Sequence, residues 1–162
     1  MGKDMDKDVM LSRMMRLCAQ SEHCIGDIRR KLSALPASEQ DEIIETLCRD
    51  GYLDEKRYAR AFARDKSALQ GWGSLKISLA LQRKAVAPDA IASALEEIDG
   101  EAAGRKLEQL LRGKLKELAS ENDPHKREAR LLRYAMGRGY TYDQIRKTYD
   151  NIRRDQTAQA AN

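Results

Sequence analysis

Apolar residues recur along most of the chain at the three- and four-residue spacing of an amphipathic helix. Alternating runs of β-branched residues, which are typical of strands, are absent from the sequence. The pattern therefore predicts an all-α protein. The stripes that carry this prediction are Leu107, Leu110, Leu111, Leu115 and Leu118; Met10, Met14 and Leu17; Ile91, Leu95 and Ile98; and Ile145, Tyr149 and Ile152.

Glycine and proline turn signals divide these stripes into about nine helical segments, which we expect to form three groups of three. The second helix of each group carries a basic stretch, and equivalent positions recur about every 50 residues. A triplet of this size cannot bury its apolar face alone, so tandem helix-turn-helix-like repeats should stack into an elongated, curved molecule. The expected boundaries are 1–54, 55–99 and 100–154, with a disordered tail at 155–162.

The stretch GYLDEKRYARAF predicts an elbow between the first and second groups. Gly51 should end one helix in the left-handed conformation, and Asp54 should cap the next helix. Leu53 and Tyr58 should pack against each other across that cap. Tyr52 should pack beneath the junction.

Three other helix starts carry capping or proline signals. Thr141 and Gln144 form a T-x-x-Q capping box at the beginning of the last helix. Pro88 and Pro124 should occupy first helical positions, where a missing N–H costs nothing, and Asp123 should cap the second of these helices.

The charge is distributed unevenly along the 162 residues, which carry a net charge of +4. Residues 1–54 contain 8 basic and 11 acidic side chains, residues 55–99 contain 8 and 6, and residues 100–162 contain 14 and 9. An acidic N-terminal part and a basic C-terminal part favour binding to a partner whose surface is itself charged. The alternative is that the charge only keeps the protein in solution.

The sequence contains no recognisable catalytic or metal-binding pattern. His23 and His125 lie far apart, no GxxxxGK[ST] phosphate loop occurs, and the three cysteines form no CxxC pair. The first residues are too polar for a signal peptide, and no apolar run approaches the roughly 20 residues that span a bilayer. We therefore expect a non-enzymatic cytoplasmic protein with no metal and no cofactor.

Basic side chains on the predicted helices are the remaining candidates for binding chemistry. One interpretation is a solvated helix face whose cations pair with Glu55, Asp65 or Glu128. The other is a basic strip that meets phosphates or acidic patches on a protein. The candidates are Arg29, Arg30 and Lys31 in the first group; Arg57, Arg60, Arg64, Lys76, Arg83 and Lys84 in the second; and Arg127, Arg130 and Arg133 in the third.

Three aromatic residues lie among these basic residues and could stack on nucleic-acid bases, namely Trp72, Tyr134 and Tyr142. Each stands beside a turn or on an apolar stripe, and this position favours packing over stacking.

Taken in order, GYLDEKRYARAF and GWGSLKISLALQRKAVAPDAIASAL resemble the RecX family, the bacterial regulators of the recombinase RecA. The resemblance is strongest over 50–95, continues more loosely through REARLLRYAMGRGYTYDQI, and is faint in CIGDIRRKL and EIIETLCRDGYLD. The chain departs from the family pattern at three turns. Ala85 stands where members usually have glycine, Cys24 where Ser or Thr often caps a helix, and Ser74 where proline is frequent.

The resemblance implies a modular all-helical protein that binds in the groove of RecA filaments on single-stranded DNA. Such a protein inhibits the ATPase, coprotease and strand-exchange activities of RecA and so restrains recombination and the SOS response. The implied partners are the RecA filament and single- or double-stranded DNA, with no membrane, and the protein would act as a monomer. Two alternatives remain, a direct helix-turn-helix-like DNA-binding regulator and a helical-repeat scaffold for another protein.

Overall fold

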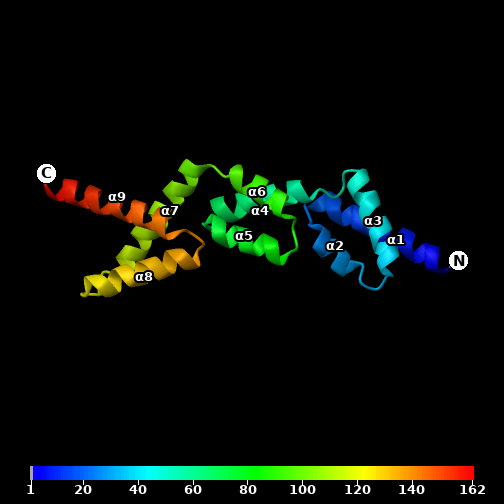
Figure 1. The fold of residues 1–162 in the computed structure, drawn as a ribbon, viewed down its shortest axis with the longest axis horizontal. Helices are drawn as coiled ribbons and strands as arrows, with labels where there is room; N and C mark the ends of the chain where they lie inside the picture. Colours follow the sequence, from blue (N-terminus) through cyan, green and yellow to red (C-terminus); the bar gives the residue numbers. More distant parts are fainter. Residues whose placement is uncertain (1) are drawn as a thin grey trace. The chain divides into compact units, whose positions relative to one another are not determined.

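The computed structural model describes residues 2–162, and within this range it contains nine α-helices and no strand, which confirms the predicted all-α class (Figure 1). None of the helices in this range has the length and apolar content needed to cross a bilayer. The helices are α1 (Gly2–Gln20), α2 (Ile25–Lys31), α3 (Ala37–Arg49), α4 (Glu55–Ala68), α5 (Ser74–Arg83), α6 (Pro88–Glu96), α7 (Gly100–Glu117), α8 (Pro124–Gly137) and α9 (Tyr142–Ala160).

The helices form two compact units, and each unit is made from two stretches of the chain. Unit 1 consists of residues 2–62 together with Ala80–Glu96. Unit 2 consists of Ala63–Leu79 together with Glu97–Asn162. Because α4 and α5 each contribute to both units, the three repeats drawn from the sequence do not coincide with these units, and their boundaries stay a prediction.

The core of unit 1 lies where α1 and α2 pack against α3. Met14 of α1, Ile28 of α2 and Leu47 of α3 are buried there, as the spacing of the apolar positions predicts. Ile28 and Leu32 are four residues apart and therefore face the same side of this short helix.

The core of unit 2 lies among α7, α8 and α9, which pack against one another. The leucine stripe of α7 supplies Leu107, Leu111 and Leu118, all of which are buried. The stripe of α9 supplies Ile145 and Ile152, which are fully buried. Burial of a leucine or isoleucine side chain contributes about 1.5–3 kcal/mol, so these stripes are the main source of stability in the unit.

The elbow between α3 and α4 has the predicted glycine turn and the predicted helix cap, and one of its residues differs from the prediction. Gly51 has a φ of 79°, the Asp54 carboxylate accepts a 3.0 Å hydrogen bond from the Arg57 N–H, and Leu53 and Tyr58 are buried. The prediction for Tyr52 is wrong, because its side chain is 36% exposed. The N–H groups of residues 52 and 53 both donate hydrogen bonds to the carbonyl of residue 47, so Tyr52 lies in a tight turn.

The predicted helix starts in the second half of the chain are confirmed. Thr141 and Gln144 form the reciprocal capping box, with distances of 2.9 and 3.2 Å. Asp123 accepts a 2.9 Å hydrogen bond from the N–H of residue 125 ahead of Pro124, and α6 begins at Pro88.

The last helix continues further than the sequence suggested. It runs to Ala160, so residues 155–160 are helical where we expected a disordered tail. The segment is rich in Ala and Gln, which are good helix formers, and it propagates a helix that the capping box has already started.

Candidate functional site

Two places in the structure bring basic residues from distant parts of the chain together, one in each unit. In unit 1 the start of α2 meets the end of α5. The Cys24 thiol lies 4.0 Å from the carbonyl oxygen of Lys84, and a Cβ atom on Gly26 would lie 2.8 Å from the same oxygen. The Lys84 ammonium lies 3.5 Å from the Asp27 carboxylate, and Ala85 follows with a φ of 59°. We call these five residues the side-chain joint.

Asp27 is the charged centre of the side-chain joint, because it binds the cations of Lys84 and Arg30. Its side chain is only 19% exposed. Partial burial alone would raise the pKa of Asp27, but the hydrogen bond from Cys24 and the charges of Lys84 and Arg30 outweigh it and hold the pKa below its ordinary value. Two of the candidate cations therefore share one carboxylate.

Other candidate cations in unit 1 also hold elements in place. The Arg57 guanidinium lies 2.5 Å from the Glu22 carboxylate and donates a 3.1 Å hydrogen bond to the Gly51 carbonyl, so it braces the elbow before α4. The hydrogen bond to Glu22 raises the pKa of Arg57. Arg29 lies 2.8 Å from Asp41 on α3. These contacts are ion pairs, but their acidic partners are not the three residues that the sequence suggested.

The third predicted group shows the same behaviour at the junction of α7 and α8. The Arg127 guanidinium donates a 3.2 Å hydrogen bond to the backbone carbonyl of Glu121. Arg130 lies 3.7 Å from the carboxylate of the same residue. Earlier in unit 2, Arg64 of α4 lies 3.5 Å from its neighbour Asp65. One acidic residue thus holds two of the three candidates on α8.

Three candidates differ from these, namely Lys31, Arg83 and Arg133. Each is exposed, and in the part of the chain that the structure describes none lies within 4.0 Å of a carboxylate oxygen. Arg60 is also exposed. Lys31, Arg83 and Arg133 are therefore more available to a partner than the candidates that form ion pairs.

Unit 2 contains the second meeting place, where the loop before α5 contacts the turn before α9. The Gly73 N–H donates a 2.7 Å hydrogen bond to the Arg138 carbonyl, and the Leu75 N–H donates a 3.1 Å bond to the Gly139 carbonyl. The buried Tyr140 hydroxyl donates a 3.1 Å bond to the carbonyl of residue 71. Main-chain atoms make most of these contacts, so we call the loop 70–75 with the turn 138–140 the main-chain joint.

Four cations surround this loop. The ammonium groups of Lys66 and Lys76 lie 4.7 and 4.4 Å from the centre of the Trp72 ring. A Cβ atom on the neighbouring Gly71 would lie 3.2 Å from the Lys106 side chain and 3.3 Å from the Arg138 guanidinium. We call the group of Lys66, Trp72, Lys76, Lys106 and Arg138 the tryptophan cluster.

Sequence reasoning found only Lys76 among these four cations. Lys66 lies on α4, Lys106 on α7 and Arg138 after α8, so no local spacing joins them. The two glycine-flanked residues, Trp72 in Gly-Trp-Gly and Arg138 in Gly-Arg-Gly, were the available signal, because such turns allow two backbones to approach closely.

The three aromatic candidates differ in their surroundings. Trp72 is partly buried between lysines, and the ammonium of Lys114 lies 5.0 Å from the centre of the Tyr134 ring. The expected packing is wrong for Tyr142, whose side chain is 51% exposed. Tyr142 is the first residue of α9 and precedes the buried part of its apolar stripe.

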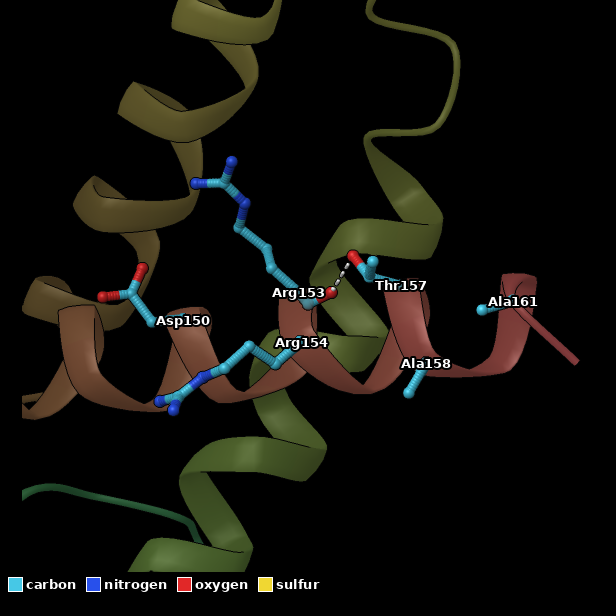
Figure 2. A pocket seen from close by; sticks show the side chains of 6 residues that line it. All are labelled: Asp150, Arg153, Arg154, Thr157, Ala158 and Ala161. Carbon is cyan, nitrogen blue, oxygen red and sulfur yellow. Dashed lines mark hydrogen bonds between the residues drawn. The ribbon is translucent and has the colours of Figure 1, made fainter.

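A pocket along α9 offers no obvious chemistry. Figure 2 shows the side chains of Arg153 and Arg154 extending away from each other, while the Thr157 hydroxyl donates a 3.0 Å hydrogen bond to the Arg153 carbonyl. The Arg154 guanidinium lies 2.6 Å from the side chain of Asn151. The pocket is lined by Asp150, Arg153, Arg154, Thr157, Ala158 and Ala161.

Acid–base and metal chemistry find little support elsewhere. Among residues 6–162, whose side chains the structure describes, no three His, Cys, Asp or Glu side chains gather in a way that could hold a metal ion. Burial raises the pKa of the Cys18 and Cys24 thiols, which disfavours the reactive thiolate. His23 lies 3.1 Å from the Ser21 hydroxyl in an exposed position.

Comparison with known proteins gives consistent matches. The model described as "RecX, second three-helix domain" matches residues 54–95, and "RecX, third three-helix domain" matches residues 105–148. A protein from Trichlorobacter lovleyi named "Regulatory protein RecX" is 30% identical over 158 residues, which covers 92% of this chain and 98% of the relative.

A protein of the same name from Clostridium botulinum (strain Eklund 17B / Type B) is 36% identical over 123 residues. That match covers 74% of this chain but only 57% of the relative, so this chain spans little more than half the length of that protein. Among solved structures, RecX from Lactobacillus salivarius is similar with a TM-score of 0.80 at 18% identity, and the match covers 90% of this chain and 96% of that one. The structural likeness supports the fold.

Proposed function

The chain belongs to the RecX family of regulatory proteins, and from this premise we propose that it regulates the recombinase RecA. It binds RecA filaments on single-stranded DNA and inhibits their ATPase, coprotease and strand-exchange activities. It acts by binding, without a catalytic step of its own. The observation that carries the proposal is the match of RecX domain models to two successive helical segments, 54–95 and 105–148.

Three of the exposed candidate cations, which have no carboxylate partner in the described part of the chain, are the contact residues we propose. Lys31, Arg83 and Arg133 keep their charge available, whereas pairs such as Arg57 with Glu22 must break before they can bind anything else. Charges of this kind speed the encounter with an acidic protein surface and can also meet phosphates. The paired candidates act as positioning residues that hold the helices.

The first test measures DNA-dependent ATP hydrolysis by RecA on single-stranded DNA while this protein is added. We expect substoichiometric amounts to slow the hydrolysis, because one bound inhibitor affects a filament of many subunits. Normal turnover in the presence of excess protein would contradict the proposal.

A charge-reversal series then tests the contact residues. Lys31→Glu with Arg83→Glu, and separately Arg133→Glu, should each raise the concentration needed for half-inhibition by roughly tenfold or more, since both remove attraction and add repulsion. Arg16→Glu is the matched control, because Arg16 is also exposed, lies on α1 and was not a candidate. If the control weakens inhibition as much as the other two variants, then net charge and not these residues is responsible.

A further inference from the structure

Exposed apolar side chains lie on the two segments that meet at the main-chain joint, and we propose that they bind the acidic surface of α3 and the elbow in a second copy of this chain. The contact joins two different surfaces, and each copy carries both of them. The inference goes beyond the proposed action on RecA, because the contact needs neither RecA nor DNA. It also differs from the monomer that the family resemblance implies.

Most of the large apolar side chains that the fold leaves exposed belong to these two segments. In the described part of the chain seven such side chains are exposed, and five of them lie within residues 66–79 or 130–142. Their exposed fractions run from 47% to 77%. Covering an exposed leucine completely contributes about 1.5–3 kcal/mol, so these side chains favour a partner. We call the five residues the apolar patch, namely Leu69, Leu75, Leu79, Met136 and Tyr142.

The main-chain joint connects the two segments that carry the apolar patch. The Leu75 N–H donates a 3.1 Å hydrogen bond to the Gly139 carbonyl. The Arg138 guanidinium donates a 2.6 Å hydrogen bond to the carbonyl of residue 70. Leu75 and Leu79 are four residues apart on α5 and therefore lie on the same side of that helix. The segments are thus positioned before a partner arrives, and binding does not have to order them.

The charges on the segments that carry the apolar patch are all of one sign. Residues 66–79 and 130–142 contain five basic side chains and no acidic one. In the described part of the chain, Lys76, Arg133 and Arg138 have no carboxylate oxygen within 4.0 Å. A partner that fits this surface therefore presents apolar groups with acidic side chains beside them.

Unit 1 carries a surface of this composition in residues 37–55, which we call the acidic segment. It consists of α3, the elbow and the first residue of α4, and it contains seven acidic side chains and one basic one. Asp41 and Glu42 already bind cations of α2 and α1. Glu45 is exposed and has no basic nitrogen within 4.0 Å in the range that the structure describes. Tyr52 is 36% exposed and adds an aromatic ring of the kind that is enriched in protein interfaces.

Charge decides between the two ways in which the apolar patch could meet a second copy. If the patches of two copies met each other, the basic side chains of both would face each other without a carboxylate between them, and like charges repel. Contact between the patch of one copy and the acidic segment of another brings opposite charges together and covers apolar side chains at the same time. Such a head-to-tail contact is heterologous, so a third copy can add to the pair.

Sedimentation velocity of the full chain, without RecA or nucleic acid, tests the contact. We expect the sedimentation coefficient to rise with protein concentration at low salt and to rise less at high salt, because salt screens the attraction between the two surfaces. Leu75→Ser with Leu79→Ser removes part of the apolar patch. Glu45→Lys with Tyr52→Ser reverses a charge and removes the ring in the acidic segment. Each double variant should raise the dissociation constant roughly tenfold or more.

A mixture of the two double variants gives the sharpest result. The patch variant keeps its acidic segment, and the acidic-segment variant keeps its patch. An equimolar mixture should therefore form dimers at a concentration where neither variant associates alone. These dimers should not grow further, because each copy has lost the other half of the contact. A mixture that stays monomeric overturns the head-to-tail contact, and so does a loss of association in the patch variant alone.

The matched control is Val9→Ser with Glu96→Lys, because both residues are exposed and lie outside the two surfaces. Circular dichroism checks that every variant keeps its helix content. Equal weakening in the control overturns the assignment, and so does a wild-type sedimentation coefficient that does not change with concentration at low salt. A wild-type protein that stays monomeric but binds polyglutamate assigns the patch to a different acidic protein and overturns the second copy as its partner. No RecA is present, so any of these failures leaves the RecA proposal standing.

Discussion

In the side-chain joint of unit 1 and in the main-chain joint of unit 2, two segments that are far apart in the sequence lie in close contact. Different kinds of atoms make the contact in the two units. In unit 1, an ion pair between Asp27 and Lys84 accompanies the close approach of Gly26 to a carbonyl oxygen. In unit 2, N–H groups of the loop before α5 bond directly to the carbonyls of Arg138 and Gly139. The first joint therefore depends on charge, and the second on the absence of side-chain atoms.

The difference has a consequence for binding. In a joint made with charged side chains, nearby cations are bound to carboxylates. Lys84 therefore cannot bind a partner until it separates from Asp27. Beside the joint made with backbone atoms, Lys76 and Lys106 have no carboxylate oxygen within 4.0 Å in the described part of the chain. The structure thus separates basic residues that stabilise the fold from basic residues that are free to bind.

The largest expected effect comes from closing the space in the main-chain joint. A Cβ atom on Gly73 would lie 2.3 Å from the Gly139 carbonyl oxygen, so Gly73→Ala must separate the two backbones and break their hydrogen bonds. We expect the free energy of unfolding to fall by about 3 kcal/mol. Urea denaturation measures the change.

Gly113→Ala provides the control for that prediction. Gly113 lies inside α7, and a Cβ atom there would meet nothing within 4 Å. The substitution should stabilise the protein by about 0.5–1 kcal/mol through helix propensity. If Gly73→Ala behaves like Gly113→Ala, the backbone approach is not what holds the main-chain joint.

A smaller change, an increase in the free energy of unfolding, is expected for a substitution in the side-chain joint. Ala85 has a φ of 59°, a region that non-glycine residues occupy at a cost of about 1–2 kcal/mol. Ala85→Gly relieves this strain but increases the entropy of the unfolded chain, so we expect a net gain of about 0.5–1 kcal/mol. Thermal unfolding measures the gain. Ala92→Gly, at an exposed position inside α6, should instead destabilise the protein by about 1 kcal/mol.

Many features of the fold could be predicted from the sequence because they depend on local patterns. The leucine stripe of α7, the capping box at Thr141 and the left-handed Gly51 all follow from residues within one or two helical turns. The resemblance to the RecX family, and not a local pattern, marked Ala85 as a position where glycine is usual, and the structure gives it a positive φ.

The remaining features depend on contacts between residues far apart in the chain. Helical spacing places Arg57 on an exposed face, but it cannot show that Glu22, 35 residues earlier, pairs with it. Lys106 and Arg138 approach Gly71 only because the turn before α9 packs on the loop before α5. Sequence patterns identified candidate cations, and tertiary packing decides which of them remain available.

The smallest effect concerns the charge on which the side-chain joint depends. Asp27→Asn removes the anion that holds Lys84 and Arg30, and we expect a loss of about 0.5 kcal/mol at neutral pH, because both cations are partly exposed. The folded-state pKa of Asp27 lies below its ordinary value, so its contribution to stability is complete above the unfolded-state pKa of about 3.9 and is lost as the pH falls further. The stability difference between wild type and Asp27→Asn, measured by urea denaturation, should therefore shrink below about pH 4. Asp41→Asn is the control, because Asp41 forms an exposed pair with Arg29 and does not contact Lys84. If the stability difference between wild type and Asp27→Asn stays constant at low pH, then packing and not charge holds the side-chain joint. The contrast between the two units would then disappear.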